Sequence, residues 1–383
     1  MTSTSSRYTP LVILALIAAL VAMVWLYVGE RSRKYVADED NHTAAGEQQT
    51  YQWKLVTTWP KNFPGLGTAP EKFAKVVNTM SSGRLQIKVF GAGELVPAMG
   101  VFDAVSTGSV QAGHGAAYYW KGKLPAAAFF TAVPFGMNAQ EMNGWLYHGG
   151  GMELWREAYA PFNLIPFAGG NTGVQMAGWF NKEISELDDI RGLKMRIPGS
   201  AGEVWSRLGG AAVTLPGGEL YTSLQTGVID ATEWVAPYND MSFGFHEVAK
   251  YYYYPGWHEP GSTLELIINK QAYEALPDDL QMIVTVAARY ANADMLDEYT
   301  ARNNTALKEL VDHHGVELRR FPDDVIRGLH KASDAYLKEL AASNEMAGKV
   351  YESWQAFKED AKEYHRISEK AYINARDIDY RGE

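Results

Sequence analysis

Two stretches decide the fold: LYTSLQTGVIDATEWVAP at residues 220–237 and VFDAVSTGSVQAGHGAAY at residues 101–118. Each predicts a helix that ends at Thr-Gly, followed by a short strand and a loop. Ligands of α/β sheets bind outside the carboxyl ends of the strands, where such loops lie. The repeat therefore predicts an α/β fold of two lobes, each with one copy, and a ligand cleft between the lobes.

The composition is that of a globular protein without a nucleic-acid partner. The chain has 383 residues, of which 46% are hydrophobic, which is enough for two domains that share a cleft. Its net charge of −10 and the absence of a basic stripe argue against nucleic acid. Cysteine is absent, which excludes disulfides, thiolate catalysis and zinc sites built on sulfur, and suits an oxidising compartment.

Strand and helix patterns alternate from Tyr51 onward, which favours a mostly parallel α/β arrangement. Residues 84–90, RLQIKVF, alternate between apolar and polar as a half-buried strand does. After Pro277 a helical pattern with an acidic start continues to Gly315. These patterns predict two sheets followed by long C-terminal helices.

The N-terminus carries an unbroken apolar run at residues 11–28, long enough to cross a bilayer. No convincing cleavage site follows, so we expect residues 1–34 to form an uncleaved anchor rather than a cleaved signal peptide. Residues 35–50 are polar and predict a linker. Orientation is in conflict, because more basic residues follow the run than precede it: Arg7 precedes it, and Arg31, Arg33 and Lys34 follow it.

A helical pattern at residues 346–374 carries one aromatic and apolar stripe. The stripe predicts either packing on the chain's own core or a homodimer contact through a protruding helix. Its members are Val350, Trp354, Phe357, Ala361, Tyr364 and Ala371.

Arg196 stands at the end of the strand pattern LKMRIPG, residues 193–199. Pro198 fixes the chain there, and Gly199 lets it turn toward a helix. An arginine on a rigid strand end offers a planar fork that suits a carboxylate. The alternative is a surface arginine paired with an acidic side chain.

Glu233 and Trp234 follow a strand end in the second repeat. Successive strand residues point to opposite faces, so a chain that leaves the strand is needed to present the Glu233 carboxylate together with the Trp234 carbonyl. Gln175 could add an amide oxygen. Hard oxygen donors suit Na⁺ or Ca²⁺, although this set alone is a weak metal signal.

Residues 51–345 resemble an extracytoplasmic solute-binding protein of the tripartite ATP-independent periplasmic (TRAP) transporters. Single motifs are weak, but their order and spacing together are specific. The motifs are FDAVSTGSVQAGHG at 102–115, ELDDIRGLKMRIPG at 186–199, LGGAAVTLPGGELYTSLQTGVIDATEW at 208–234 and LPDDLQ at 276–281.

The resemblance implies roles for these residues. Arg196 would bind the substrate carboxylate, and Gln175 stands where most members carry a basic residue. That difference and the Glu233-Trp234 pair are similar to the branch that binds 2-oxo or 2-hydroxy monocarboxylates through a bound Na⁺ or Ca²⁺. Gln175, Glu233 and the Trp234 carbonyl would hold this cation. The resemblance also implies Tyr118 as a substrate contact and Glu259 as a further metal ligand.

The resemblance implies a periplasmic receptor that delivers its acid to membrane permease subunits, and it resolves the orientation conflict. The expected first lobe combines residues 51–170 with 263–310, and the second spans 171–262. Residues 311–383 would form a C-terminal helical region.

Two functions compete. The first is a receptor, which is not an enzyme. The second is an anchored periplasmic metal-dependent enzyme acting on similar acids. The sequence disfavours the enzyme, because no acid–base or nucleophile–base pair is evident near the predicted cleft.

Overall fold

The computed structural model describes residues 13–15, 17–30 and 49–379, in two units that meet between Thr50 and Tyr51. In the first unit the helix Ile13–Glu30 is long and apolar enough to cross a membrane, although a signal sequence meets the same criterion. The predicted linker at 35–50 lies outside the described residues, apart from residues 49 and 50.

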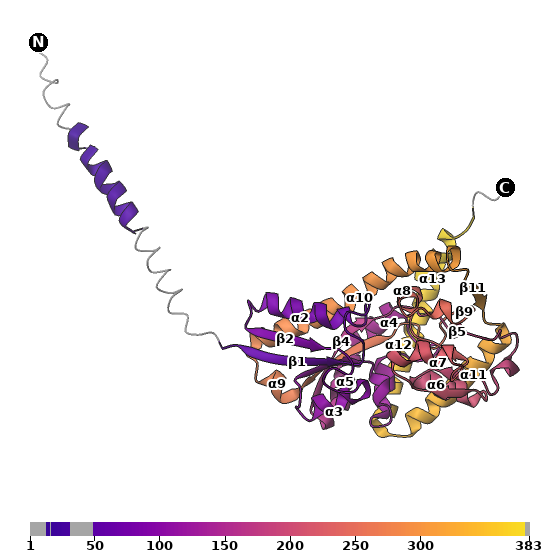
Figure 1. Ribbon diagram of the computed structural model, residues 1–383. Helices are drawn as coiled ribbons and strands as arrows, with labels where there is room; N and C mark the ends of the chain where they lie inside the picture. Colours follow the sequence, from indigo (N-terminus) through magenta and orange to yellow (C-terminus); the bar gives the residue numbers. More distant parts are fainter. Residues whose placement is uncertain (1–12, 16, 31–48, 380–383) are drawn as a thin grey trace, which may run out of the picture. The chain divides into compact units, whose positions relative to one another are not determined.

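The second unit is built on two mixed sheets, which confirms the two-lobed α/β fold (Figure 1). We call the part around the five-stranded sheet the first lobe and the part around the six-stranded sheet the second lobe. The five-stranded sheet has the order β2 (Leu85–Phe90), β1 (Tyr51–Thr57), β3 (Ala112–Gly115), β10 (Thr263–Asn269) and β4 (Leu164–Asn171). The six-stranded sheet has the order β11 (Glu317–Arg320), β9 (Tyr251–Tyr254), β5 (Gly178–Phe180), β8 (Ala231–Thr232), β6 (Lys194–Arg196) and β7 (Ala211–Val213).

Both predicted repeats have the expected form. Helix α3 (Val101–Ser106) precedes β3, and α7 (Leu220–Gln225) precedes β8. Each helix is followed by a glycine in the left-handed region, Gly108 with φ +75° and Gly227 with φ +72°. Glycine adopts this conformation without a steric cost, which explains why both helices stop there.

The chain passes between the lobes at residues 172–177, 255–262 and 313–316. The first two crossing segments lie side by side: the Thr172 amide donates to the Ser262 carbonyl (3.1 Å), and the Gln175 amide donates to the Glu259 carbonyl (3.1 Å). A Cβ on Gly256 would lie 2.0 Å from the Gln175 carbonyl oxygen. The close approach of the two segments therefore requires glycine at this position.

The long helix predicted after Pro277 is α10 (Asp278–Asp312), which packs against β4 and α2 in the first lobe and against α8 in the second. The expected helical region 311–383 also contains a strand. After Gly315, β11 pairs in parallel with the edge of β9. The lobe boundaries expected from the sequence otherwise stay a prediction. The remaining α-helices are α2 (Thr68–Met80), α4 (Ala139–His148), α5 (Gly151–Tyr159), α6 (Gly199–Arg207), α8 (Pro237–Ser242), α9 (Lys270–Glu274), α11 (Asp323–Ala342), α12 (Glu345–Ile367) and α13 (Glu369–Arg376).

The core of the first lobe encloses a carboxyl group, that of Glu265 on β10. The Trp120 indole N–H donates to Glu265 Oε1, and the Tyr159 hydroxyl donates to Oε2 (2.7 Å). Burial raises the pKa of Glu265 from 4.5 to about 7, and the two hydrogen bonds offset part of this increase. The core therefore holds a carboxyl group that is easier to protonate than one in water.

We expect the ligand-free protein to lose stability as the pH rises through 7. The folded-state pKa of Glu265 is raised, so its contribution to stability is complete below pH 4.5 and is lost as the pH passes about 7. Thermal unfolding at pH 5.5 and pH 8.5 measures the change. Glu265→Gln should show a smaller difference in Tm between the two pH values. An equal difference in variant and wild type would contradict this role.

Candidate functional site

A small buried cavity lies where the two lobes meet, with a volume of about 20 Å³, roughly the room for one water. Five of the six residues predicted from the sequence line it: Tyr118, Gln175, Arg196, Trp234 and Glu259. The sixth, Glu233, contacts Arg196 directly. The structure thus brings all six together from three separate stretches of the second unit and one helix of the first repeat.

Arg196 ends β6 and is only 2% exposed, which excludes the surface arginine as an alternative. Its Nη1 pairs with the Glu233 carboxylate and donates to the Glu233 carbonyl (3.0 Å), while Nε donates to the Leu215 carbonyl (3.2 Å). Burial alone would lower the pKa of Arg196, but Glu233 outweighs this and the pKa is raised. The guanidinium also lies 5.0 Å from the Trp234 ring, a cation–π contact.

Gly199 explains the end of the LKMRIPG motif. Its φ is +67°, and a Cβ there would lie 3.0 Å from the Tyr118 ring. Tyr118 comes from the short helix Ala117–Trp120 in the first lobe, so glycine allows this ring to pack against the start of α6 in the second lobe. The motif therefore places Arg196 and the contact between the lobes within four residues.

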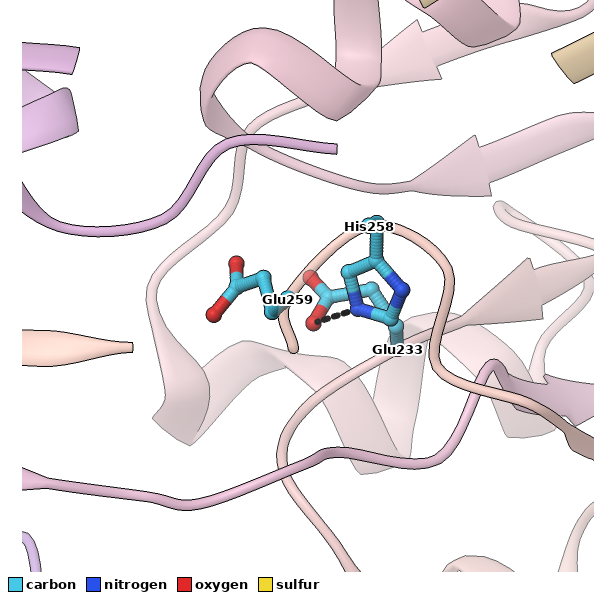
Figure 2. Close-up of side chains that lie close together, drawn as sticks. All are labelled: Glu233, His258 and Glu259. Atoms are coloured by element: carbon cyan, nitrogen blue, oxygen red, sulfur yellow. Dashed lines mark ion pairs between the residues drawn. The ribbon is translucent and has the colours of Figure 1, made fainter. Parts of the chain in front are cut away.

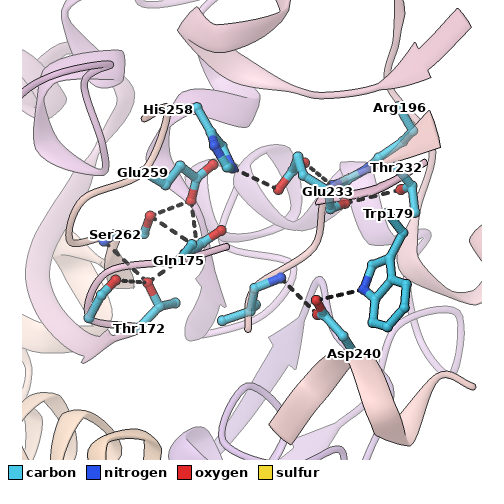
Figure 3. Close-up of polar contacts among 12 residues, drawn as sticks. Thr172, Gln175, Trp179, Arg196, Thr232, Glu233, Asp240, His258, Glu259 and Ser262 are labelled. Carbon is cyan, nitrogen blue, oxygen red and sulfur yellow. Dashed lines mark hydrogen bonds and ion pairs between the residues drawn. The ribbon is translucent and has the colours of Figure 1, made fainter. Parts of the chain in front are cut away.

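The Gln175 amide has a fixed orientation (Figure 3). Its Nε2 donates to Glu259 Oε2 (2.7 Å), Thr172 Oγ1 (3.2 Å) and Ser262 Oγ (3.3 Å), and the Ser262 hydroxyl also donates to Glu259. Gln175 Oε1 is buried and has no hydrogen-bond partner within the described part of the chain. An amide oxygen held in this way is available to a cation.

Glu233, His258 and Glu259 form a buried cluster (Figure 2), each offering a ligand atom within 4.8 Å of the others. His258 Nε2 lies 3.4 Å from Glu233 Oε2. Burial, and next the neighbouring Glu233, raise the pKa of Glu259 from 4.5 to about 6. Sequence analysis did not find His258. The available signal was its position beside Glu259 in a segment that crosses between the lobes.

Asp240 is a second functional residue that the sequence did not reveal. Strand β8 ends at Thr232, so Glu233 and Trp234 lie on a chain that has left the strand, as predicted. The Asp240 carboxylate accepts hydrogen bonds from the Val235 amide (3.2 Å), the Trp179 indole (3.0 Å) and the Tyr252 hydroxyl (2.7 Å). Burial raises its pKa to about 7. Asp240 therefore holds the turn that carries Glu233 and Trp234.

The donor set fits a hard cation next to a carboxylate ligand. The described side chains supply carboxylate oxygens from Glu233 and Glu259 and a free amide oxygen from Gln175. One guanidinium faces two carboxylates in this buried space, so an added positive charge is favourable. The Trp234 carbonyl as a further ligand stays a prediction.

Comparison with known proteins identifies relatives of this chain. Residues 55–344 match the family model described as bacterial extracellular solute-binding protein, family 7. A monocarboxylate 2-oxoacid-binding periplasmic protein of Nostoc sp. is 45% identical over 84% of this chain and 88% of that protein.

Two solved structures are similar as well. A TRAP periplasmic solute-binding protein of Pseudoalteromonas atlantica, with bound sodium and pyruvate, is 45% identical, with a TM-score of 0.83 over 85% of this chain and 99% of that chain. One from Bordetella bronchiseptica, a mixed-occupancy dimer with calcium and picolinate, is 38% identical, with a TM-score of 0.84 over 86% and 97%. This chain therefore belongs to family 7 of the bacterial extracellular solute-binding proteins, the receptors of TRAP transporters.

Proposed function

We propose that this protein captures a small 2-oxo or 2-hydroxy monocarboxylate together with Na⁺ or Ca²⁺ and delivers the acid to TRAP permease subunits in the membrane. The observation that carries the proposal is the buried Arg196, which lies beside Glu233 and the unpartnered Gln175 oxygen in one cavity. The relatives with pyruvate and sodium or with picolinate and calcium support the same ligand class.

Each group has a distinct part in this proposal. Arg196 binds the substrate carboxylate through its planar fork. Gln175, Glu233 and the Trp234 carbonyl hold the cation, with Glu259 as a further ligand, and Tyr118 contacts the substrate. Even a three-carbon acid is larger than the cavity of about 20 Å³, so the direct Arg196–Glu233 contact has to separate to admit it. The cation then compensates Glu233 in place of the guanidinium.

Metal and acid should bind cooperatively. The ligand tightens the metal by the same factor as the metal tightens the ligand. Glu233→Gln removes one buried charge at nearly constant shape, so it should weaken both by tenfold or more. Arg196→Lys keeps the charge but loses the fork, so it should weaken the acid and leave the metal largely unchanged. Calorimetry with pyruvate, in Ca²⁺, in Na⁺ and without either, measures these effects, and we expect Ca²⁺ to bind more tightly than Na⁺.

In a thermal-shift assay, pyruvate at a hundredfold excess over its Kd should add about 2.7 kcal/mol of apparent stability. Acid affinity that is independent of every cation and of Glu233→Gln would exclude the metal bridge. The enzyme alternative deserves a direct control, because His258 lies beside two carboxylates. Pyruvate and lactate incubated with the protein should stay unchanged by NMR, and turnover of either would overturn the receptor.

We propose that the receptor works in the periplasm, tethered to the inner membrane by the uncleaved helix Ile13–Glu30. The expected result is a membrane-bound protein whose measured mass includes residues 1–28. Replacing residues 1–34 with a cleavable signal peptide serves as the control and should release the protein in soluble form. Recovery of a trimmed, soluble wild-type protein would overturn the anchor.

We also propose a homodimer through the C-terminal helices. The stripe on α12 is divided: Val350 and Trp354 are fully buried in the chain's own core, whereas Tyr364 is 64% exposed and Ile367 68% exposed. Light scattering should give a dimer for the wild type and a monomer for the double variant Tyr364→Glu, Ile367→Glu. Met282→Glu changes an equally exposed apolar residue on α10 and should stay dimeric. A monomeric wild type would contradict the proposal.

A further inference from the structure

We infer that Trp59, held in place by His114, sets the chain length of the acid, so that the receptor selects three-carbon acids over longer ones. The inference rests on the proposed function, because it specifies the ligand within the proposed class. It depends on the packing of one indole ring and on the hydrogen bond that anchors it.

Trp59 forms an aromatic wall of the cavity. It follows β1, lines the cavity and is 2% exposed. Its ring packs edge-on against Trp234, with centroids 6.2 Å apart and planes at 84°, and it lies 6.1 Å from the Tyr119 ring. Trp234 in turn contacts the Arg196 guanidinium. Trp59 is therefore one ring away from the group that binds the substrate carboxylate.

The indole cannot rotate away without losing a buried hydrogen bond. Trp59 Nε1 donates to His114 Nδ1 (2.9 Å). His114 Nε2 lies 3.2 Å from the Gly169 carbonyl, which can only accept, so Nε2 carries the hydrogen and Nδ1 is free to accept from the indole. His114 is 1% exposed, and burial lowers its pKa to about 4. The imidazole is therefore neutral at ordinary pH and keeps this role.

The Trp59 backbone is fixed as well. Its carbonyl accepts hydrogen bonds from the Ala92 amide (2.8 Å) and from the Thr57 hydroxyl (2.8 Å). Both ends of the residue are thus held by groups of the first lobe. The other apolar walls, Leu66, Val235 and Leu264, have no polar side-chain atom and can adapt by changing rotamer.

A longer acid would therefore meet the indole. Moving the indole would leave His114 Nδ1 buried and without a donor, which carries the cost of an unsatisfied polar group. Adaptable pockets discriminate a single methylene by about 10- to 200-fold. A wall anchored by a buried hydrogen bond should reject longer chains at the upper end of this range.

The test is the ratio of Kd values for 2-oxovalerate and pyruvate, measured by calorimetry with Ca²⁺ present. A ratio does not depend on the fraction of active protein. The wild type should bind pyruvate at least 100-fold more tightly. Trp59→Leu should reduce this ratio at least tenfold, chiefly by tighter binding of 2-oxovalerate. His114→Ala should reduce it in the same direction.

His114→Asn is the matched rescue variant, because the Asn side-chain oxygen can accept the indole N–H in place of Nδ1. It should keep the wild-type ratio. Leu264→Ala enlarges the same cavity without touching the anchor and should change the ratio less than Trp59→Leu.

Three results would be adverse. An unchanged ratio in Trp59→Leu, or a wild type that binds both acids equally, would overturn the inference while the proposed function stands. A larger effect from Leu264→Ala than from Trp59→Leu would assign the wall to Leu264 and also overturn it. A wild type that binds no 2-oxo acid in any cation would overturn the proposed function itself.

Discussion

The site depends on the cost of burying Arg196. A guanidinium that is 2% exposed needs anionic or carbonyl partners, and Arg196 finds them in the Glu233 carboxylate and in the Glu233 and Leu215 carbonyls. Removing one partner of a buried ion pair typically costs about 3–5 kcal/mol. Glu233 can therefore release Arg196 to a substrate only when another positive charge takes its place. This exchange is the physical reason for linking the acid to a cation.

The site also lies where the two lobes are connected. Gln175 belongs to one crossing segment and Glu259 to the next, and hydrogen bonds of both backbone and side chain join them. Tyr118, from the first lobe, packs on Gly199 of the second. A ligand that contacts Arg196, Gln175 and Tyr118 therefore interacts with both lobes and with their connection. Such a ligand stabilises the arrangement of lobes seen here by its differential affinity for it.

Local patterns predicted the parts of the fold that local chemistry determines. Gly108 and Gly227 end helices because of their own backbone conformation, and Arg196 ends a strand because Pro198 and Gly199 follow it. Features that depend on distant partners were less accessible. Strand β11 has only four residues and exists because it pairs with β9, more than 60 positions earlier in the chain.

The candidate site divides in the same way. Arg196 and the Glu233-Trp234 loop were visible as motifs, whereas Tyr118 and Glu259 came only from the family resemblance. His258 and Asp240 gained their roles through contacts with residues on other elements. The stripe on α12 has correct helical spacing, but spacing alone does not reveal that Trp354 is buried while Tyr364 is exposed.

The charges of the site bear on which cation it prefers. Oxygen donors alone accept either Na⁺ or Ca²⁺. With Glu233, Glu259 and the bound acid ionised, three negative charges face the single positive charge of Arg196 in a space that excludes most water. A monovalent ion leaves one negative charge uncompensated, whereas a divalent ion balances the sum. Since uncompensated charge is costly at low dielectric, the electrostatics of the closed site favour Ca²⁺.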